Sequence, residues 1–157
     1  MNRIMERETY MRLALDLARE AGQSGDVPVG AVVIDGTGTV IGRGRNRREE
    51  RRSAVCHAEI EAIQEACRKA GSWRLDDCAL YVTLEPCPMC AGAILNARIP
   101  TVIYGAKEPV TGSCGSVLNL FEERYGFHPA IYGGVLGDEC AALLQEFFRD
   151  LRSAAEP

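Results

Sequence analysis

Apolar and polar residues recur with two different periods along this chain, and the change of period predicts its elements. Segment 6–23 carries apolar side chains at helical spacing, which is typical of a helix with one buried face. Segment 57–70 shows the same spacing, and Gly71 predicts where that helix ends. We expect further helices from the cysteine pair at 87–90 to about residue 97 and at 138–152, with Asp138 as the cap of the last one.

Short apolar runs between these helices predict strands. Residues 27–34 form one such run, a turn signal follows at 35–38, and 39–42 resumes the strand pattern. The segment 27–46 is therefore predicted to be a β-hairpin. Gly30, inside the first strand, predicts a β-bulge, with close approach of a flat ligand to its bare backbone as the alternative.

The remaining pattern completes the fold prediction. Strands are expected at 78–84, 100–105 and 130–135, and a short helix at 117–125. Strands that alternate with helices are typical of α/β layers around one sheet. A length of 157 residues fits a single domain spanning 1–157.

Composition narrows the function classes. The chain is 46% hydrophobic and 25% charged, and no apolar run approaches the roughly 20 residues that span a bilayer. The charged segment 1–8 lacks the apolar core of a signal peptide, so we expect a cytoplasmic protein without membrane contact. A net charge of −4 does not favour nucleic-acid binding. Segment 43–52 nevertheless holds six arginines and two glutamates, and forms either a solvated loop or a basic edge for a polyanion.

Two cysteines carry the strongest chemical signal. Cys87 and Cys90 are three residues apart where a strand pattern gives way to a helix pattern. Free N–H groups and the positive dipole end at a helix start favour thiolates, which are soft metal ligands. His57 also opens a predicted helix, and Glu59 follows two residues later.

Together these residues favour a catalytic zinc site. One nitrogen and two sulfur ligands suit tetrahedral zinc, and three protein ligands leave one position for water. Glu59 would then carry protons during hydrolysis at an electron-poor sp² carbon. The alternatives are a redox function for the Cys-Pro-x-Cys pair and a zinc-stabilised binding module without catalysis.

The motifs resemble those of the zinc-dependent cytidine deaminase-like superfamily. His57-Ala58-Glu59 with Pro86-Cys87-Pro88-Met89-Cys90 matches its signature. The segments 27–32, 81–87 and 138–144 are further similar to bacterial tRNA-specific adenosine deaminases, by motif order and spacing across most of the chain.

This resemblance implies a fold, a reaction and a set of residues. It implies three layers, α/β/α, around a mixed five-stranded sheet, and hydrolysis of adenosine to inosine at the wobble position of a tRNA anticodon. Zinc, one ion per subunit, would be bound by His57, Cys87 and Cys90, and the hydroxide on it would attack carbon 6 of the flipped-out purine, with Glu59 as the proton shuttle. Substrate contacts are expected from Val29, Asn46, Ala58, Leu84 and Glu108.

The resemblance also implies partners. An anticodon stem-loop offers unpaired bases that can enter a pocket. Candidate phosphate contacts are Arg45, Arg47, Arg48, Arg149 and Arg152. A homodimer is expected, because the family usually forms one. The alternative within the superfamily is deamination of a free nucleobase or nucleoside of the guanine or cytosine type, which the acidic net charge favours.

Overall fold

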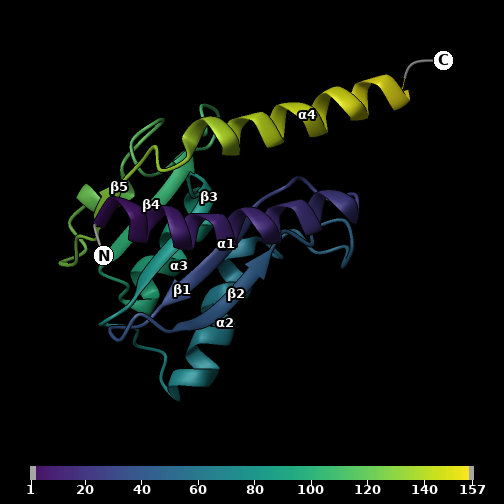
Figure 1. The fold of residues 1–157 in the computed structure, drawn as a ribbon. Coiled ribbons are helices and arrows are strands. Elements are labelled where there is room, and N and C mark those ends of the chain that lie inside the picture. Colours follow the sequence, from purple (N-terminus) through teal and green to yellow (C-terminus); the bar gives the residue numbers. More distant parts are fainter. Residues whose placement is uncertain (1–2, 156–157) are drawn as a thin grey trace.

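The computed structural model describes residues 3–155 and consists of one sheet with helices on both faces (Figure 1). The outermost ends of the predicted 1–157 domain, residues 1–2 and 156–157, lie outside the described part. The elements are, in chain order, α1 (Arg3–Gln23), β1 (Gly30–Ile34), β2 (Val40–Arg45), α2 (Ala58–Ala70), β3 (Ala79–Leu84), α3 (Pro88–Ala97), β4 (Thr101–Ala106), the 3₁₀ turn η1 (Leu120–Glu122), β5 (Ala130–Tyr132) and α4 (Gly137–Ala155).

The sheet has five strands in the order β2-β1-β3-β4-β5. The β1–β2 hairpin and the β1–β3 pair are antiparallel, whereas β3, β4 and β5 run parallel. The predicted hairpin and the predicted mixed five-stranded sheet are confirmed.

Alternation along the strands divides the core between the two faces of the sheet. Val33, Leu80 and Val102 pack with α2 and α3 on one face, and Val32, Tyr81 and Ile103 pack with α1 and α4 on the other. The three-layer α/β/α architecture is therefore confirmed. The outer half of α4 projects beyond the sheet, which explains why Cys140 is the one buried residue among those of this helix that the structure describes (Figure 1).

Three local predictions are wrong. The segment 117–125 forms only the single 3₁₀ turn η1, because most of its side chains stay exposed and do not pack on the sheet. The last strand covers 130–132 instead of 130–135. Helix α4 begins at Gly137, so Asp138 lies inside its first turn and is not its cap.

Gly30 also differs from its prediction. The irregularity in the β1–β2 pairing lies between Val33 and Ile34, so Gly30 is not a bulge. A Cβ atom at residue 30 would lie 2.0 Å from the carbonyl oxygen of Ala14 and 2.7 Å from the backbone nitrogen of Ala18. Glycine is needed here because the backbone of α1 packs directly on the strand.

This packing predicts opposite effects of one substitution at two glycines. Gly30→Ala is expected to lower the free energy of unfolding by about 1–3 kcal/mol or more, because the new methyl group meets rigid backbone. Gly92→Ala on α3, where no atom lies within 4 Å of the new Cβ, should raise it by about 0.5–1 kcal/mol. Urea unfolding of both variants measures this. Equal stability of Gly30→Ala and the wild type would contradict the close packing.

Candidate metal and substrate site

The ends of four strands meet at one edge of the sheet and place the predicted site residues there. Val29 comes directly before β1, and Asn46 directly after the antiparallel β2. Leu84 ends β3, and the loop that carries Glu108 follows its parallel neighbour β4. Strand direction thus brings together residues that are far apart in the sequence.

Two helices begin at this same edge, each with a predicted ligand as its N-terminal cap. His57 caps α2 and Cys87 caps α3, both with extended backbone angles, and Pro88 occupies the first turn of α3. Cys90 lies on the first turn of α3 and is fully buried. The positive ends of both helix dipoles therefore point at one site and favour thiolates there.

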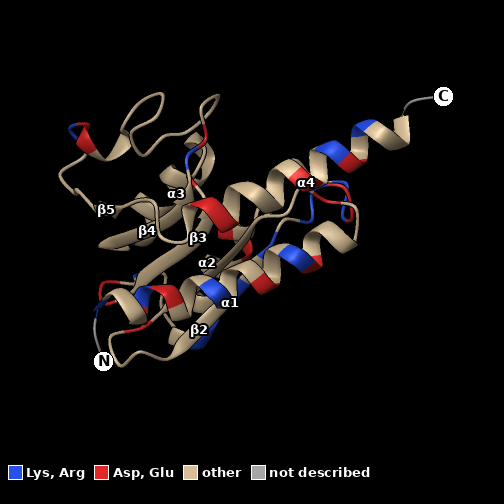
Figure 2. Cartoon of the chain, turned by 45° about the horizontal axis from the view of Figure 1, so that its top comes forward, with Lys and Arg blue, Asp and Glu red and all other residues tan. Residues whose placement is uncertain are grey.

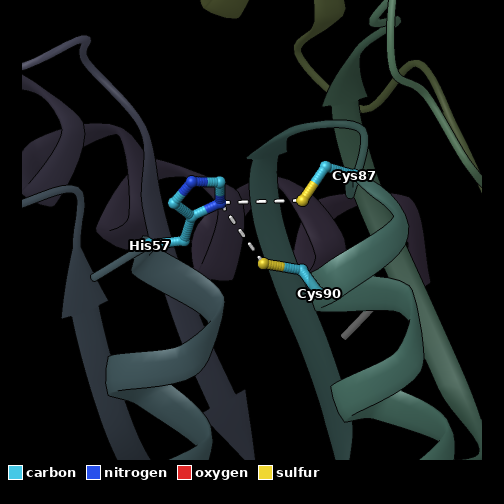
Figure 3. A group of neighbouring side chains, drawn as sticks. All are labelled: His57, Cys87 and Cys90. Carbon is cyan, nitrogen blue, oxygen red and sulfur yellow. Dashed lines mark hydrogen bonds between the residues drawn. The ribbon is translucent and has the colours of Figure 1, made fainter. Parts of the chain in front are cut away.

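The three side chains converge (Figure 3). Nδ1 of His57 lies 3.7 Å from Sγ of Cys87 and 3.5 Å from Sγ of Cys90. Their ligand atoms all lie within 4.8 Å of one another, and they form the one such cluster found in residues 3–155. Nitrogen and sulfur ligands on a tetrahedral zinc ion are about 3.6 Å apart, so the donor set and its spacing fit that metal.

Hydrogen bonds among the three side chains shift the pKa values of His57 and Cys87. A hydrogen bond from Cys90 and the neighbouring His57, against the effect of burial, lower the pKa of the Cys87 thiol to about 4. The hydrogen bond with Cys87, again against burial, raises the pKa of His57. The pair thus carries a thiolate on Cys87 at neutral pH, which is the form that binds a metal.

Glu59 lies on the first turn of α2 and is 4% exposed. Burial raises the pKa of its carboxyl group, and a hydrogen bond from its own backbone N–H and the charge of His57 oppose that rise. A carboxyl group that keeps a raised pKa beside a metal-ligand cluster is typical of a proton carrier.

A cavity of about 240 Å³ opens at this site. All five predicted substrate contacts line it, together with His57, Glu59, Cys87 and Arg48. Four further residues line it: Thr111, from the loop after Gly105 that the resemblance assigns to the pocket wall, and Val27, Glu85 and Phe148, which the sequence did not assign to the site. Phe148 gave no local signal, since it reaches the cavity from α4, about 60 residues beyond the cysteines in the printed sequence.

The predicted phosphate contacts occupy different surroundings. Arg48 is exposed and lines the cavity, and Arg152 lines an adjoining groove between α4 and the segment 106–109. Arg149 is exposed on α4, and Figure 2 shows basic and acidic residues side by side along the outer half of this helix. Arg45 and Arg47 instead form ion pairs, with Glu50 for both and with Glu61 for Arg47.

Glu85 is the buried carboxylate that the sequence did not reveal. It is 2% exposed and accepts hydrogen bonds from three backbone N–H groups and one hydroxyl group of the segment 108–116. Burial raises its pKa, but the bonds from Ser116, Glu108 and Cys114 outweigh this and leave the pKa lowered.

Comparison with known proteins agrees with this geometry. A family model described as MafB19-like deaminase matches residues 5–152. The chain belongs to this deaminase family. It is 45% identical over 146 residues to a tRNA-specific adenosine deaminase of Bacillus subtilis (strain 168), covering 92% of this chain and 90% of the relative.

Solved structures of deaminases share the fold. One comes from a study of A-to-I editing by tRNA:A34 deaminases at the wobble position of transfer RNA, with a TM-score of 0.82, 43% identity, and coverage of 86% of this chain and 98% of that one. A guanine deaminase from Nitrosomonas europaea gives a TM-score of 0.79 at 26% identity, covering 89% of this chain and 83% of that one. The predicted membership of the deaminase superfamily is confirmed.

Proposed function

We infer that this protein hydrolyses adenosine to inosine at the wobble position of a tRNA anticodon, releasing ammonia. One observation carries this inference: the buried Glu59 lines one cavity together with His57 and Cys87 of the cluster that Cys90 completes. The chain around that cavity is 45% identical to a tRNA-specific adenosine deaminase. The redox and binding-module alternatives leave the carboxylate in this cavity without a role.

We propose zinc as the metal, one ion per subunit, held by His57, Cys87 and Cys90. The spacing of their ligand atoms and the nitrogen and sulfur donor set support this choice. When bound, zinc supplies a water nucleophile at neutral pH by lowering the pKa of that water towards about 7.

The chain's own residues then move protons and hold the base. Glu59 accepts the proton of the attacking water, gives it to the purine ring nitrogen, and assists departure of ammonia. Asn46 is 9% exposed, and its amide is fixed by a bond to the carbonyl of Val27 and a bond from the N–H of Arg48. One amide N–H and one oxygen lone pair remain for the edge of the base.

The walls of the cavity suit a flat base. Val29, Ala58 and Leu84 offer apolar surface to the ring. Glu108 lies at the loop side, where its carboxylate accepts the N–H of Val110, and we assign its second oxygen to a sugar hydroxyl. The cavity excludes bulk water from Glu59, since that side chain is almost fully buried.

The RNA backbone is proposed to cross the surface between Arg48 and α4. Arg48, Arg149 and Arg152 are the direct phosphate contacts we propose, because each is exposed to solvent. Arg45 and Arg47 already pair with the carboxylates of Glu50 and Glu61, and binding a phosphate would break these ion pairs. We therefore assign them mainly to stabilising the arginine-rich segment 43–52.

Arg48→Ala tests this surface. We expect KM for an anticodon stem-loop to rise about tenfold and the slope of log KM against log salt concentration to fall by about one unit, because one phosphate contact is lost. Arg68→Ala is the matched control, since Arg68 is exposed in the last turn of α2, at the end opposite the site. An unchanged salt slope in Arg48→Ala would rule out this contact.

The decisive assay compares substrates. The metal-loaded protein is incubated with anticodon stem-loops, with unfractionated tRNA, and with free adenosine, guanine and cytosine. Inosine at position 34, read by sequencing of the tRNA, is the expected product. Ammonia release from guanine or cytosine alone would favour the alternative, which the fold similarity to a guanine deaminase supports at only 26% identity.

Assembly and location complete the proposal. We propose a single deaminase domain that forms a homodimer in the cytoplasm, where its tRNA substrate would be found. The exposed apolar side chains Val117, Leu118 and Tyr125 support a dimer, because a subunit interface would cover such groups. Light scattering after size exclusion measures the mass.

None of the helices in the described chain is long and apolar enough to span a bilayer.

A further inference from the structure

The role of Glu85 goes beyond the chemistry described so far. This residue directly follows the last residue of β3, Leu84, and lies two positions before Cys87. Its side chain is 2% exposed and forms no ion pair with any residue in the range 3–155. A buried carboxylate needs compensation for its lost hydration, and here hydrogen bonds from one loop provide it.

Four donors of that loop converge on the two carboxylate oxygens. Oε1 accepts the N–H of Glu108 at 3.1 Å and the hydroxyl of Ser116. Oε2 accepts the N–H of Cys114 and the N–H of Ser116, both at 3.1 Å. The donors span residues 108–116, so one side chain fixes both ends of this loop.

The loop closes tightly around the carboxylate. A Cβ atom at Gly112 would lie 2.5 Å from Oε2 of Glu85 and 2.3 Å from the carbonyl oxygen of Glu108. The N–H of Ser113 also bonds to the carbonyl of Pro86 at 2.9 Å, which ties the loop to the residue beside Cys87. The loop is therefore fastened to the same segment that carries two metal ligands.

The loop also forms one wall of the cavity, through Glu108 and Thr111. We propose that Glu85 is a positioning residue: its carboxylate holds loop 107–118 against the metal-binding segment, so that Glu108 and Thr111 face the RNA substrate. This proposal rests on the function inferred above. It assigns to Glu85 a role in substrate affinity, with proton transfer left to Glu59.

Glu85→Gln is the sharpest test, because it keeps the shape and removes half of the acceptors. The amide oxygen can accept from the N–H groups of Cys114 and Ser116, and the hydroxyl of Ser116 can turn to accept from the NH₂ group. The N–H of Glu108 then faces a donor and loses its acceptor. We expect hydrogen exchange of peptides within 107–118 to accelerate about tenfold, and KM for the stem-loop to rise about tenfold. Metal content should stay at the wild-type value, and kcat within about threefold of it.

Asp35→Asn is the matched control. Asp35 also accepts bonds from backbone N–H groups, those of Thr37 and Thr39, in the β1–β2 turn at the end of the hairpin opposite the cavity. This variant should accelerate exchange in peptides around 35–40 and leave exchange in 107–118, KM and kcat unchanged. Ser116→Ala, which removes one donor at an exposed residue, should give a smaller rise in loop exchange and in KM, and it keeps the test available where Glu85→Gln does not fold.

Unchanged loop exchange in both Glu85→Gln and Ser116→Ala would overturn the proposal. A loosened loop with unchanged KM would overturn it as well, since the loop would then not contribute to substrate affinity. Loss of metal in Glu85→Gln, with loop exchange unchanged, would assign Glu85 to the metal site instead. A wild-type protein that fails to deaminate the stem-loop would reject the proposed function. Hydrogen exchange needs no substrate, so it would still test whether Glu85 holds loop 107–118.

Discussion

Glu59→Gln is expected to lower deamination of the anticodon stem-loop by about 10²–10⁴-fold, the usual contribution of a positioned acid or base. Glutamine fills the same buried space but cannot take a proton from water or return it to the base. Metal binding should persist, because the proposed ligands His57, Cys87 and Cys90 are untouched. The thermal midpoint of the metal-free variant at pH 7 should equal or exceed that of the wild type.

The last expectation follows from the direction of the pKa shift. Burial raises the pKa of Glu59 in the folded protein, so its ionisation costs stability as the pH rises above the unfolded pKa of 4.5. Replacing it with a neutral amide removes that cost. Single-turnover inosine formation, metal analysis and calorimetry together measure these outcomes.

Glu65→Gln is the matched control, since Glu65 lies further along the same helix and, within residues 3–155, forms an ion pair with Lys69 alone. It should leave turnover unchanged. Turnover of Glu59→Gln within threefold of the wild type would remove Glu59 from the mechanism, and a simultaneous loss of metal would show that the carboxylate supports the ligands instead.

The parts of this fold that sequence predicts best are those set by local periodicity. Strand alternation and helical spacing placed the ends of β1 to β4 and of the four helices to within about three residues. The helix prediction for 117–125 failed because its apolar residues do not form one buried face. Val117 and Leu118 remain exposed, whereas Phe121 is buried and Leu120 packs beside it, partly buried.

The convergence of His57, Cys87 and Cys90 was predictable because the residues that cap a helix start, and those in its first turn, lie at the same end of the helix. His57 and Cys87 are both caps, so local sequence alone fixed where their side chains could point. Glu85 and Phe148 were not predictable in this way. The role of Glu85 depends on a loop about 20 residues later in the printed sequence, and Phe148 depends on how α4 crosses the sheet.

Gly30 is a residue whose local signal was detected but whose cause the sequence did not identify. Its position in a strand correctly indicated a close approach of another group, but the sequence could not tell which group. The structure identifies the backbone of α1, at Ala14 and Ala18. The local pattern thus indicates that Gly30 is close to something, and only the packing of α1 on β1 shows what that is.

Cys90→Ala is expected to reduce bound metal from about one ion per chain to less than about a tenth, and to abolish deamination. Cys90 is fully buried, and its Sγ lies 3.5 Å from Nδ1 of His57. Its loss leaves two of the three proposed protein ligands, too few for a stable zinc site. Because metal binding contributes to the free energy of folding, the thermal midpoint should fall too.

A chelator separates the loss of metal from the loss of packing. Chelation should lower the midpoint of the wild type and leave that of Cys90→Ala unchanged, since the variant has no metal to lose. Cys67→Ala is the matched control, because Cys67 lies on α2, half-buried and outside the cluster, and should keep both metal and activity. Full metal occupancy in Cys90→Ala would contradict the proposed ligand set, because the ion would then be held by other residues.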